Sequence, residues 1–204
     1  MGYLFALLGG YLLGCSNMAF YLEKLTKKSV RGGGSGNLGA SNAVIRLGWL
    51  AGVLVGAHDI GKALLAVYLS RWLLPQWDYA AAVAGIACVL GHIFPFYLKF
   101  KGGKGFASYV GVIFALDWKV ALAIIAMIFV VTLITDYIVA ATMMTTISAP
   151  ISLGLHQGKW LLALILCIGS AVILYRHREN LIRIFVTGDE IGLRSASSGE
   201  HRAK

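Results

Sequence analysis

The sequence predicts an all-α polytopic membrane protein with seven transmembrane helices, some short or re-entrant, its N-terminus outside and its C-terminus in the cytoplasm. Composition is the first observation behind this prediction: 58% of the 204 residues are hydrophobic and 13% are charged, whereas a soluble domain is nearer half apolar and a quarter charged. The mean hydropathy of +0.77 agrees. The second observation is that the apolar residues form seven stretches, at 3–21, 44–68, 79–98, 106–116, 120–134, 138–155 and 160–175.

Length separates these stretches. A helix needs about 20 residues to cross the bilayer core, with about 17 as a practical minimum. The stretches 3–21, 44–68, 79–98 and 138–155 meet this requirement. The stretch 106–116 is short, and only three residues separate 120–134 from 138–155, so we expect tilted or partly re-entrant helices there.

The placement of positive charge is the third observation. Lys and Arg gather in cytoplasmic loops because they resist translocation. Three segments, two loops and the tail, hold 14 of the 18 basic residues, and an even number of spans lies between each pair of segments. These residues are Lys24, Lys27, Lys28, Arg31, Arg46, Lys99, Lys101, Lys104, Arg176, Arg178, Arg183, Arg194, Arg202 and Lys204. Seven spans therefore place all three segments in the cytoplasm.

The chain reads as one transmembrane domain over residues 1–192, followed by a polar tail at 193–204 that lacks apolar anchors and is expected to be flexible. Cys15, Cys88 and Cys167 lie in apolar stretches without paired spacing. That pattern predicts buried thiols, and it argues against a zinc site or a disulfide framework.

Residues 31–46 interrupt the apolar pattern with five glycines and a series of polar side chains. Successive N–H groups of glycine-rich backbone can converge on an anion. Ser35, Asn37, Ser41 and Asn42 can donate to the same guest, and Ser41 could also cap a following helix, whose N-terminus would favour an anion. A flexible linker is the alternative interpretation.

Residues 91–108 repeat this composition, with Gly102, Gly103 and Gly105 around Lys101 and Lys104. The segment lacks the glycine spacing and the Ser or Thr of a phosphate-binding P-loop, but a lysine between glycines can reach a phosphate as a point charge. Pro95 should end the preceding helix, which places His92 in its last turns. A purely structural role for His92 is the alternative.

Residues 175–190 form a third polar segment after the last apolar stretch. His177, Asn180 and Arg183 are spaced by three residues, so they share one helical face. An imidazole, an amide and a guanidinium on one face can recognise phosphate and hydroxyl groups. An interfacial helix with solvated basic residues is the alternative.

Together, the three segments predict a site for more than one phosphate on the cytoplasmic side. The first two segments hold almost no acidic residues, which argues against a magnesium-dependent kinase, and no cysteine or serine nucleophile is evident. Direct transfer between two anionic substrates, catalysed by charge neutralisation and positioning, remains.

The motifs "GSGNLGASNAVIRLG", "GHIFPFYLKFKGGKGFAS" and "HRENLIRIFVTGDE" resemble the three signature stretches of the membrane-integral bacterial acyl-phosphate:glycerol-3-phosphate acyltransferases, in order and at similar spacing. The resemblance extends over nearly the whole chain. It implies a seven-helix enzyme of the bacterial cytoplasmic (inner) membrane, active on the cytoplasmic side. The enzyme would transfer a fatty acyl group from acyl-phosphate to the 1-hydroxyl of glycerol-3-phosphate, giving lysophosphatidic acid and phosphate, as the first acylation of phospholipid synthesis.

The resemblance also implies roles for individual residues. The catalytic residues would be Ser35, Lys104, His177 and Asn180. The substrate phosphates would be bound by Gly34, Gly36, Asn37, Gly39, Ser41, Asn42, Arg46, Lys101, Gly102, Gly103 and Gly105. Further candidates are His92, Thr142 and Arg183. The proton acceptor stays open between His177, whose ordinary pKa suits a base, and a substrate phosphate.

No metal, cofactor or nucleic-acid partner is expected. The expected partners are membrane lipids and the two substrates, acyl-phosphate and glycerol-3-phosphate. A monomer fits this function, although the sequence leaves the oligomeric state open. The His–Asp pair, five positions apart, of the acyltransferases with soluble or peripheral catalytic domains does not occur after any histidine. Phe20, Trp49, Phe94 and Phe114 are unranked candidates for contact with the acyl chain.

The chain departs from this family at several positions. Asn17 stands where relatives have proline, and Asp136 and Val139 stand where they carry a basic residue and a serine. Thr142 and Thr145 are candidates to supply that hydroxyl. These differences leave the contacts of the first helix and the fifth loop open.

One rival hypothesis is a transporter for an organic phosphate, which should have a polar path across the membrane. Asp59 and Lys62 are the obvious charges deep inside a stretch. An intramembrane ion pair is a candidate functional element by default, and helix packing is the alternative.

Overall fold

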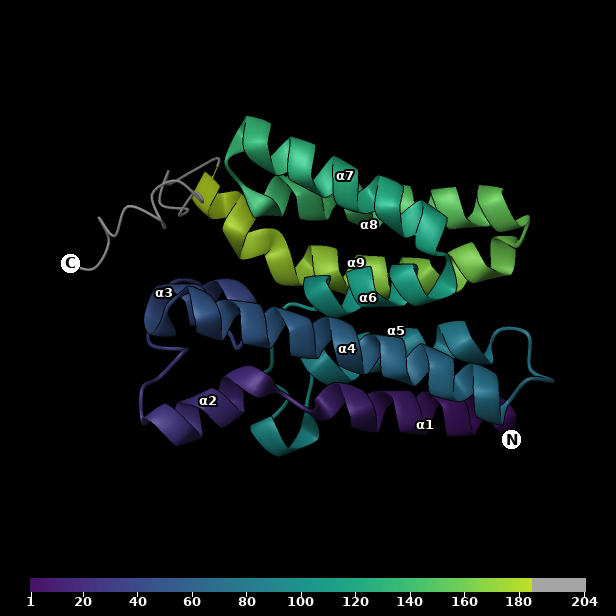
Figure 1. Ribbon diagram of the computed structural model, residues 1–204, viewed down its shortest axis with the longest axis horizontal. Helices are drawn as coiled ribbons and strands as arrows, with labels where there is room; N and C mark the ends of the chain where they lie inside the picture. The colour runs from purple at the N-terminus through teal and green to yellow at the C-terminus, as the bar shows by residue number, and fades with distance from the viewer. Residues whose placement is uncertain (185–204) are drawn as a thin grey trace.

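The computed structural model describes residues 1–184, and every regular element among them is a helix (Figure 1). The elements are α1 (Gly2–Cys15), α2 (Met18–Thr26), α3 (Ala40–Leu47), α4 (Trp49–Leu73), α5 (Ala80–Ile93), the 3₁₀ helix η1 (Phe96–Leu98), α6 (Phe106–Leu116), α7 (Trp118–Thr135), α8 (Ile138–Gln157) and α9 (Trp160–Ile182). The predicted tail at 193–204 and the end of the third motif lie outside the described residues.

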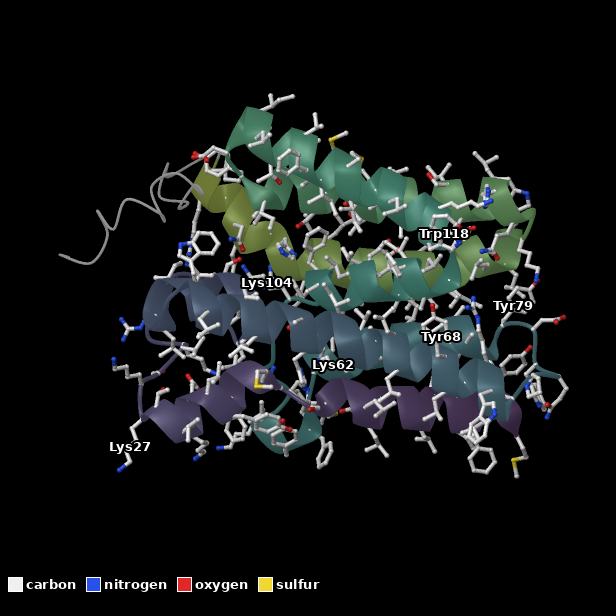
Figure 2. All side chains as sticks on the ribbon, in the orientation of Figure 1. Lys27, Lys62, Tyr68, Tyr79, Lys104 and Trp118 are labelled. Carbon is white, nitrogen blue, oxygen red and sulfur yellow. The ribbon has the colours of Figure 1, made fainter. Side chains whose placement is uncertain are left out.

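Within residues 1–184, six helical segments are long and apolar enough to cross a membrane: Gly2–Thr26, Trp49–Leu73, Ala80–Leu98, Trp118–Thr135, Ile138–Gln157 and Trp160–Ile182. The helix α6 has 11 residues, which at 1.5 Å per residue gives about 16 Å, roughly half of a bilayer core. The predicted stretch 106–116 is therefore a helix, but not one of spanning length. Figure 2 shows why: Lys104, just before α6, lies well inward of Lys27 along the long axis.

The first apolar stretch is broken into α1 and α2. Asn17 caps α2, since its Oδ1 accepts a hydrogen bond from the N–H of Phe20 at 3.0 Å. The break frees backbone carbonyls of α1, which a membrane does not tolerate without partners. The carbonyl of Cys15 accepts from the Tyr97 hydroxyl at 2.9 Å, and that of Ser16 accepts from Lys62 Nζ at 2.7 Å.

The second apolar stretch is also divided. Two helices replace the span expected at 44–68. The short helix α3 ends at Gly48, which has φ +94°, and α4 begins at the next residue and continues to Leu73. The expectation that Ser41 caps this helix is wrong: Gly39 is the N-cap residue. The positive φ of Gly48 explains the division, because L-residues with a side chain rarely adopt it.

Two layers of helices meet along the long axis (Figure 1). α1, α4 and α5 contact one another on one side, α7, α8 and α9 form the other, and α6 contacts α4, α5 and α7 between them. α1 lies so close to α5 that a Cβ on Gly10 or Gly14 would overlap the carbonyls of Ala84 and Cys88. Such small-residue contacts let helix backbones approach in membrane proteins.

The core between the layers is built from aliphatic side chains around the buried Tyr109, whose hydroxyl pairs with Ser170 at 2.8 Å. Cys15 and Cys88 are buried as predicted, but Cys167 is exposed. It lies on α9, where an apolar thiol can face lipid at no cost. The first glycine-rich loop, α3 and the C-terminal end of α9 lie at one end of the molecule, and the N-terminus lies at the other (Figure 1).

Candidate active site

One cavity of about 540 Å³ opens where the three predicted polar segments meet. Its polar lining comes from the first glycine loop (residues 32–39), α3, α4, α5, the second glycine loop (residues 102–105), α8 and α9, with one residue from the α7–α8 turn. These residues are Ser35, Asn37, Ser41, Asn42, Asp59, His92, Lys104, Asp136, Thr142, His177, Asn180 and Arg183. The structure thus brings together segments more than 140 positions apart in the sequence.

Asn42 holds the first glycine loop in shape from the start of α3. Its Oδ1 accepts from the N–H of Ser35 at 3.3 Å, and its Nδ2 donates to the carbonyl of Asn37 at 2.9 Å. Asn37 in turn donates to the hydroxyl of Ser35. Gly34 and Gly36 have φ values of +54° and +66°, the left-handed region where glycine is the usual residue. The loop is therefore ordered by side chains, which excludes the flexible-linker interpretation.

The N-terminus of α3 faces the cavity. Its cap residue, Gly39, provides no side-chain hydrogen bond, and Ala40, Ser41 and Asn42 line the cavity wall. The first N–H groups of a helix have no partner within the helix, and they carry the positive end of its dipole. The anion site that the sequence predicts for this loop therefore coincides with a helix N-terminus.

The second glycine loop folds back on the end of α5. The carbonyls of His92 and Ile93 accept from the N–H groups of Gly103 and Gly102 at 3.1 and 3.0 Å. A Cβ on Gly103 would overlap Nε2 of His92. α5 ends at Ile93, just before Pro95, so the predicted helix end and the place of His92 in its last turn are confirmed.

The two glycine loops and α9 are tied to one another. The N–H of Leu38 donates to the carbonyl of Gly102 at 3.4 Å. Lys104 Nζ donates to Oδ1 of Asn180 in a close contact, and Arg183 donates to the carbonyl of Gly34 at 3.1 Å. Figure 2 places Lys104 between the two helical layers. The shared face predicted for His177, Asn180 and Arg183 is confirmed, because all three line the cavity.

The imidazole of His177 has a defined orientation. Its Nδ1 lies 2.9 Å from the carbonyl of Ile173, one helical turn earlier. A carbonyl only accepts, so Nδ1 carries the hydrogen and, in the neutral ring, Nε2 is left as an acceptor. His177 is therefore suited to accept a hydrogen bond from a hydroxyl group in the cavity.

An ionic cluster lies on the side of the cavity that is deepest between the helices. Lys62 Nζ is 2.8 Å from Asp59 Oδ1, so the predicted intramembrane pair is formed. His92 joins it, with Nδ1 3.1 Å from the same carboxylate oxygen. Asp59 and His92 line the cavity. The sequence gives no spacing that links them, since they lie on α4 and α5; only the packing of the two helices unites them.

Some predicted residues lie elsewhere. The cavity lining does not include Gly36, Arg46, Lys101, Gly102 or Gly103. Lys101 is exposed, and its carbonyl accepts from Arg31 at 2.8 Å. Arg46 is also exposed and donates to the carbonyl of Ser29 at 3.1 Å.

Of the four aromatic candidates for contact with an acyl chain, Trp49 lines the cavity, and Phe20, Phe94 and Phe114 do not. Thr142 lines it as well, whereas Thr145 is buried outside the lining. The apolar side of the cavity, which the sequence did not predict, is formed by residues such as Val44, Val53, Ile138 and Val139.

Comparison with known proteins decides the family. The sequence matches the family described as glycerol-3-phosphate acyltransferase over residues 4–187. The chain belongs to the glycerol-3-phosphate acyltransferase family. Among its acyltransferase relatives is glycerol-3-phosphate acyltransferase 1 of Oceanobacillus iheyensis, which is 36% identical over 90% of this chain and 92% of its own length. The glycerol-3-phosphate acyltransferase of Staphylococcus aureus strain Newman is 36% identical over 88% and 92%.

Two solved acyltransferase structures have the same fold. Both are crystal structures of PlsY (YgiH), an integral membrane glycerol 3-phosphate acyltransferase. The glycerol 3-phosphate form superposes with a TM-score of 0.87 at 34% identity, covering 94% of this chain and 96% of the other. The lysophosphatidic acid form has a TM-score of 0.84 at 33% identity, covering 96% and 97%. The chain is therefore an integral membrane protein of the acyltransferase family.

Proposed function

We propose that this protein transfers a fatty acyl group from acyl-phosphate to the 1-hydroxyl of glycerol-3-phosphate, giving 1-acyl-glycerol-3-phosphate and phosphate. The observation that carries the proposal is the convergence of Lys104, Asn180 and the first glycine loop on one cavity that is also lined by apolar side chains. The polar lining residues suit two phosphates, and the apolar ones suit an acyl chain. Family membership supports the acceptor, because the relatives are named for glycerol-3-phosphate.

Charge neutralisation is the first contribution of the site. Two phosphates at about 5 Å repel each other by several kcal/mol at low effective dielectric. Lys104 and Arg183 supply positive charge at the cavity, and the N-terminus of α3 supplies a partial one. Ser35, with its hydroxyl on the cavity wall, and Asn180, which positions Lys104, complete the proposed catalytic set with His177.

Proton handling is the second contribution. The 1-hydroxyl attacks the carbonyl carbon of acyl-phosphate, the new C–O ester bond forms, and the bond to the phosphate oxygen breaks. Nε2 of His177 is an acceptor that can orient or deprotonate that hydroxyl. The proton ends on the released phosphate, so the transfer needs no other co-reactant. An acyl-phosphate is already activated, which leaves alignment as the main task.

We also propose that the cavity opens to the cytoplasm of a bacterial inner membrane, that the N-terminus lies outside, and that α6 counts as a seventh, incomplete crossing. The support is positive charge: Lys27 and Lys104 lie toward one end of the molecule and Tyr79 and Trp118 at the other (Figure 2). Basic residues gather at cytoplasmic ends. A membrane-impermeant thiol reagent in whole cells should label Asp78→Cys, and Lys27→Cys only after permeabilisation; the reverse pattern would contradict this orientation.

The donor test uses purified protein with labelled glycerol-3-phosphate and one of acyl-phosphate, acyl-CoA or acyl-carrier protein. We expect labelled lysophosphatidic acid with acyl-phosphate alone. Product from acyl-CoA alone would overturn the proposal that acyl-phosphate is the donor. Uptake of label into sealed vesicles without new lipid would instead support an organic-phosphate transporter.

A further inference from the structure

The ammonium group of Lys62 lies against three acceptor atoms. Nζ lies 2.8 Å from Asp59 Oδ1, 2.7 Å from the carbonyl of Ser16 and 2.8 Å from Nδ1 of His92. Lys62 is 7% exposed and Asp59 2%, so neither charge is solvated, and the two neutralise each other. In place of water, the buried ammonium has two hydrogen bonds, to the carbonyl of Ser16 and to Nδ1 of His92, and an ion-pair contact with Asp59.

This arrangement decides where the hydrogen of His92 lies. A contact of 2.8 Å between two nitrogens requires one hydrogen between them. Lys62 is held in its charged form by the carboxylate at its side, so Lys62 is the donor and Nδ1 is the acceptor. The neutral imidazole then carries its hydrogen on Nε2. In the alternative tautomer, Nδ1 would carry a hydrogen and donate it to Asp59 at 3.1 Å. That hydrogen would then face the hydrogens of the Lys62 ammonium group, and two donors would oppose each other.

The other ring nitrogen faces the second glycine loop. Nε2 occupies the space that a side chain on Gly103 would take, one residue before Lys104. His92 lines the cavity, and its backbone carbonyl also holds the N–H of Gly103 at 3.1 Å. Within residues 1–184, the hydrogen bonds and ion-pair contacts of the imidazole are made through Nδ1. Nε2–H is therefore a donor held against Gly103, the residue before Lys104, in the lining of the cavity.

We propose that Lys62, anchored by Asp59, fixes neutral His92 as the Nε2–H tautomer, so that His92 donates a hydrogen bond to an anionic oxygen of the substrate bound beside Lys104. Lys62 and Asp59 are positioning residues, and His92 is a binding donor. The cavity then holds two histidines of opposite tautomer: His177 accepts and His92 donates. The identity of the anion as a substrate phosphate or carbonyl oxygen rests on the proposed function, whereas the tautomer does not.

The tautomer is tested by long-range ¹H–¹⁵N correlation NMR of ¹⁵N-histidine-labelled protein in detergent micelles, with His92 assigned by the signal lost in His92→Gln. We expect the hydrogen on Nε2 in the wild type and on Nδ1 in Lys62→Met. A wild-type hydrogen on Nδ1 would overturn the proposal. If Lys62→Met does not fold, the double variant Asp59→Leu/Lys62→Met, which leaves no unpaired charge, should give a mixture of both tautomers.

The donor role is tested by kinetics of two amide variants. The amide nitrogen of glutamine can reach the position of Nε2, whereas that of asparagine reaches only the position of Nδ1. We expect kcat of His92→Asn to fall about 10²-fold, the cost of one lost donor to a developing anion, and that of His92→Gln to fall less than about 10-fold. An equal loss of kcat in both variants, or a larger loss in His92→Gln, would overturn the role of His92 as a hydrogen-bond donor.

His156→Gln is the matched control, since His156 pairs with a carboxylate, Asp117, but lies outside the cavity lining. Its kcat should equal that of the wild type. If the wild type itself makes no lysophosphatidic acid from acyl-phosphate, the proposed function fails, and the NMR result still decides the positions of the hydrogens.

Discussion

Both loops are rich in glycine, but Gly36 of the first loop and Gly103 of the second are needed for different reasons. In the first loop, Gly36 has φ +66°, and a Cβ there would meet only the carbonyl of Arg31 at 3.9 Å. In the second loop, Gly103 has an ordinary φ, but a Cβ would overlap the ring of His92. Glycine supplies backbone conformation at Gly36 and space at Gly103.

The loops also reach the cavity differently. The first loop is held by side chains, above all Asn42, and it lines the cavity over several residues. The second is held by backbone hydrogen bonds to the end of α5, and it contributes Lys104 and Gly105. Glycine-rich segments therefore do not all act in the same way. The atoms around each glycine show whether the residue is needed for its backbone conformation or to leave space for a neighbouring side chain.

The largest expected effect separates the two lysines of the second loop. Lys104→Met should lower kcat/KM about 10³-fold, because the charge next to both phosphates is lost. Lys101→Met is the matched control, since that side chain is exposed and outside the cavity lining, and its kcat/KM should stay within about twofold of the wild type. Both are measured with acyl-phosphate and labelled glycerol-3-phosphate. Similar losses would mean that the loop acts through its overall charge.

The next effect separates the two kinds of glycine. Gly103→Ala forces a methyl group into the ring of His92. It should lower the free energy of unfolding by about 2 kcal/mol, and most of the activity should be lost. Gly36→Ala keeps the space but strains φ, which should cost about 1 kcal/mol. Thermal unfolding in detergent measures both.

Gly36→Asn sharpens this comparison, because asparagine tolerates the left-handed region. It should be close to the wild type in stability. If Gly36→Asn is as damaging as Gly103→Ala, then space rather than conformation limits the first loop as well.

A smaller effect concerns the side chain that orders the first loop. Asn42→Ala removes one acceptor and one donor, and at about 0.5 kcal/mol for each of these two hydrogen bonds the KM for the phosphate substrates should rise about fivefold. Asn42→Asp keeps the acceptor for the N–H of Ser35, so the KM of this variant should rise less. An unchanged KM in both variants would show that the backbone alone orders this loop.

The smallest effect lies at the opposite end of the molecule and serves as a reference for both loops. Burial raises the pKa of Asp117, but hydrogen bonds from the N–H of Val120, from His156 and from the N–H of Lys119 outweigh it, and the net pKa is lowered. A lowered folded-state pKa stabilises the protein above the ordinary carboxyl pKa, and that contribution is lost as the pH falls through the folded value.

Asp117→Asn should therefore lower Tm slightly at pH 7, and the difference from the wild type should shrink below about pH 4. Activity at pH 7 should not change, because Asp117 lies outside the cavity lining. A Tm difference that grows on acidification would show that the carboxylate is not the stabilising form.

Much of the site was legible in local patterns. The three-residue spacing of His177, Asn180 and Arg183 placed them on one face, and Pro95 marked the end of α5. Patterns failed where a neighbour from another helix decides the outcome. Asn17 breaks the first helix because Tyr97 and Lys62 stabilise the carbonyls that the break exposes. Arg46 and Lys101 carry the right charge but lie outside the cavity lining, and their role in phosphate binding stays a prediction.

The sequence by itself determined the membrane class, the helical stretches and the three polar segments, because hydrophobic length and helical periodicity are local properties of the chain. Only the tertiary structure decided that Asp59, Lys62 and His92 form one cluster and which glycines line the cavity. These outcomes depend on contacts between α4, α5 and the second glycine loop, and such contacts leave no spacing in the sequence.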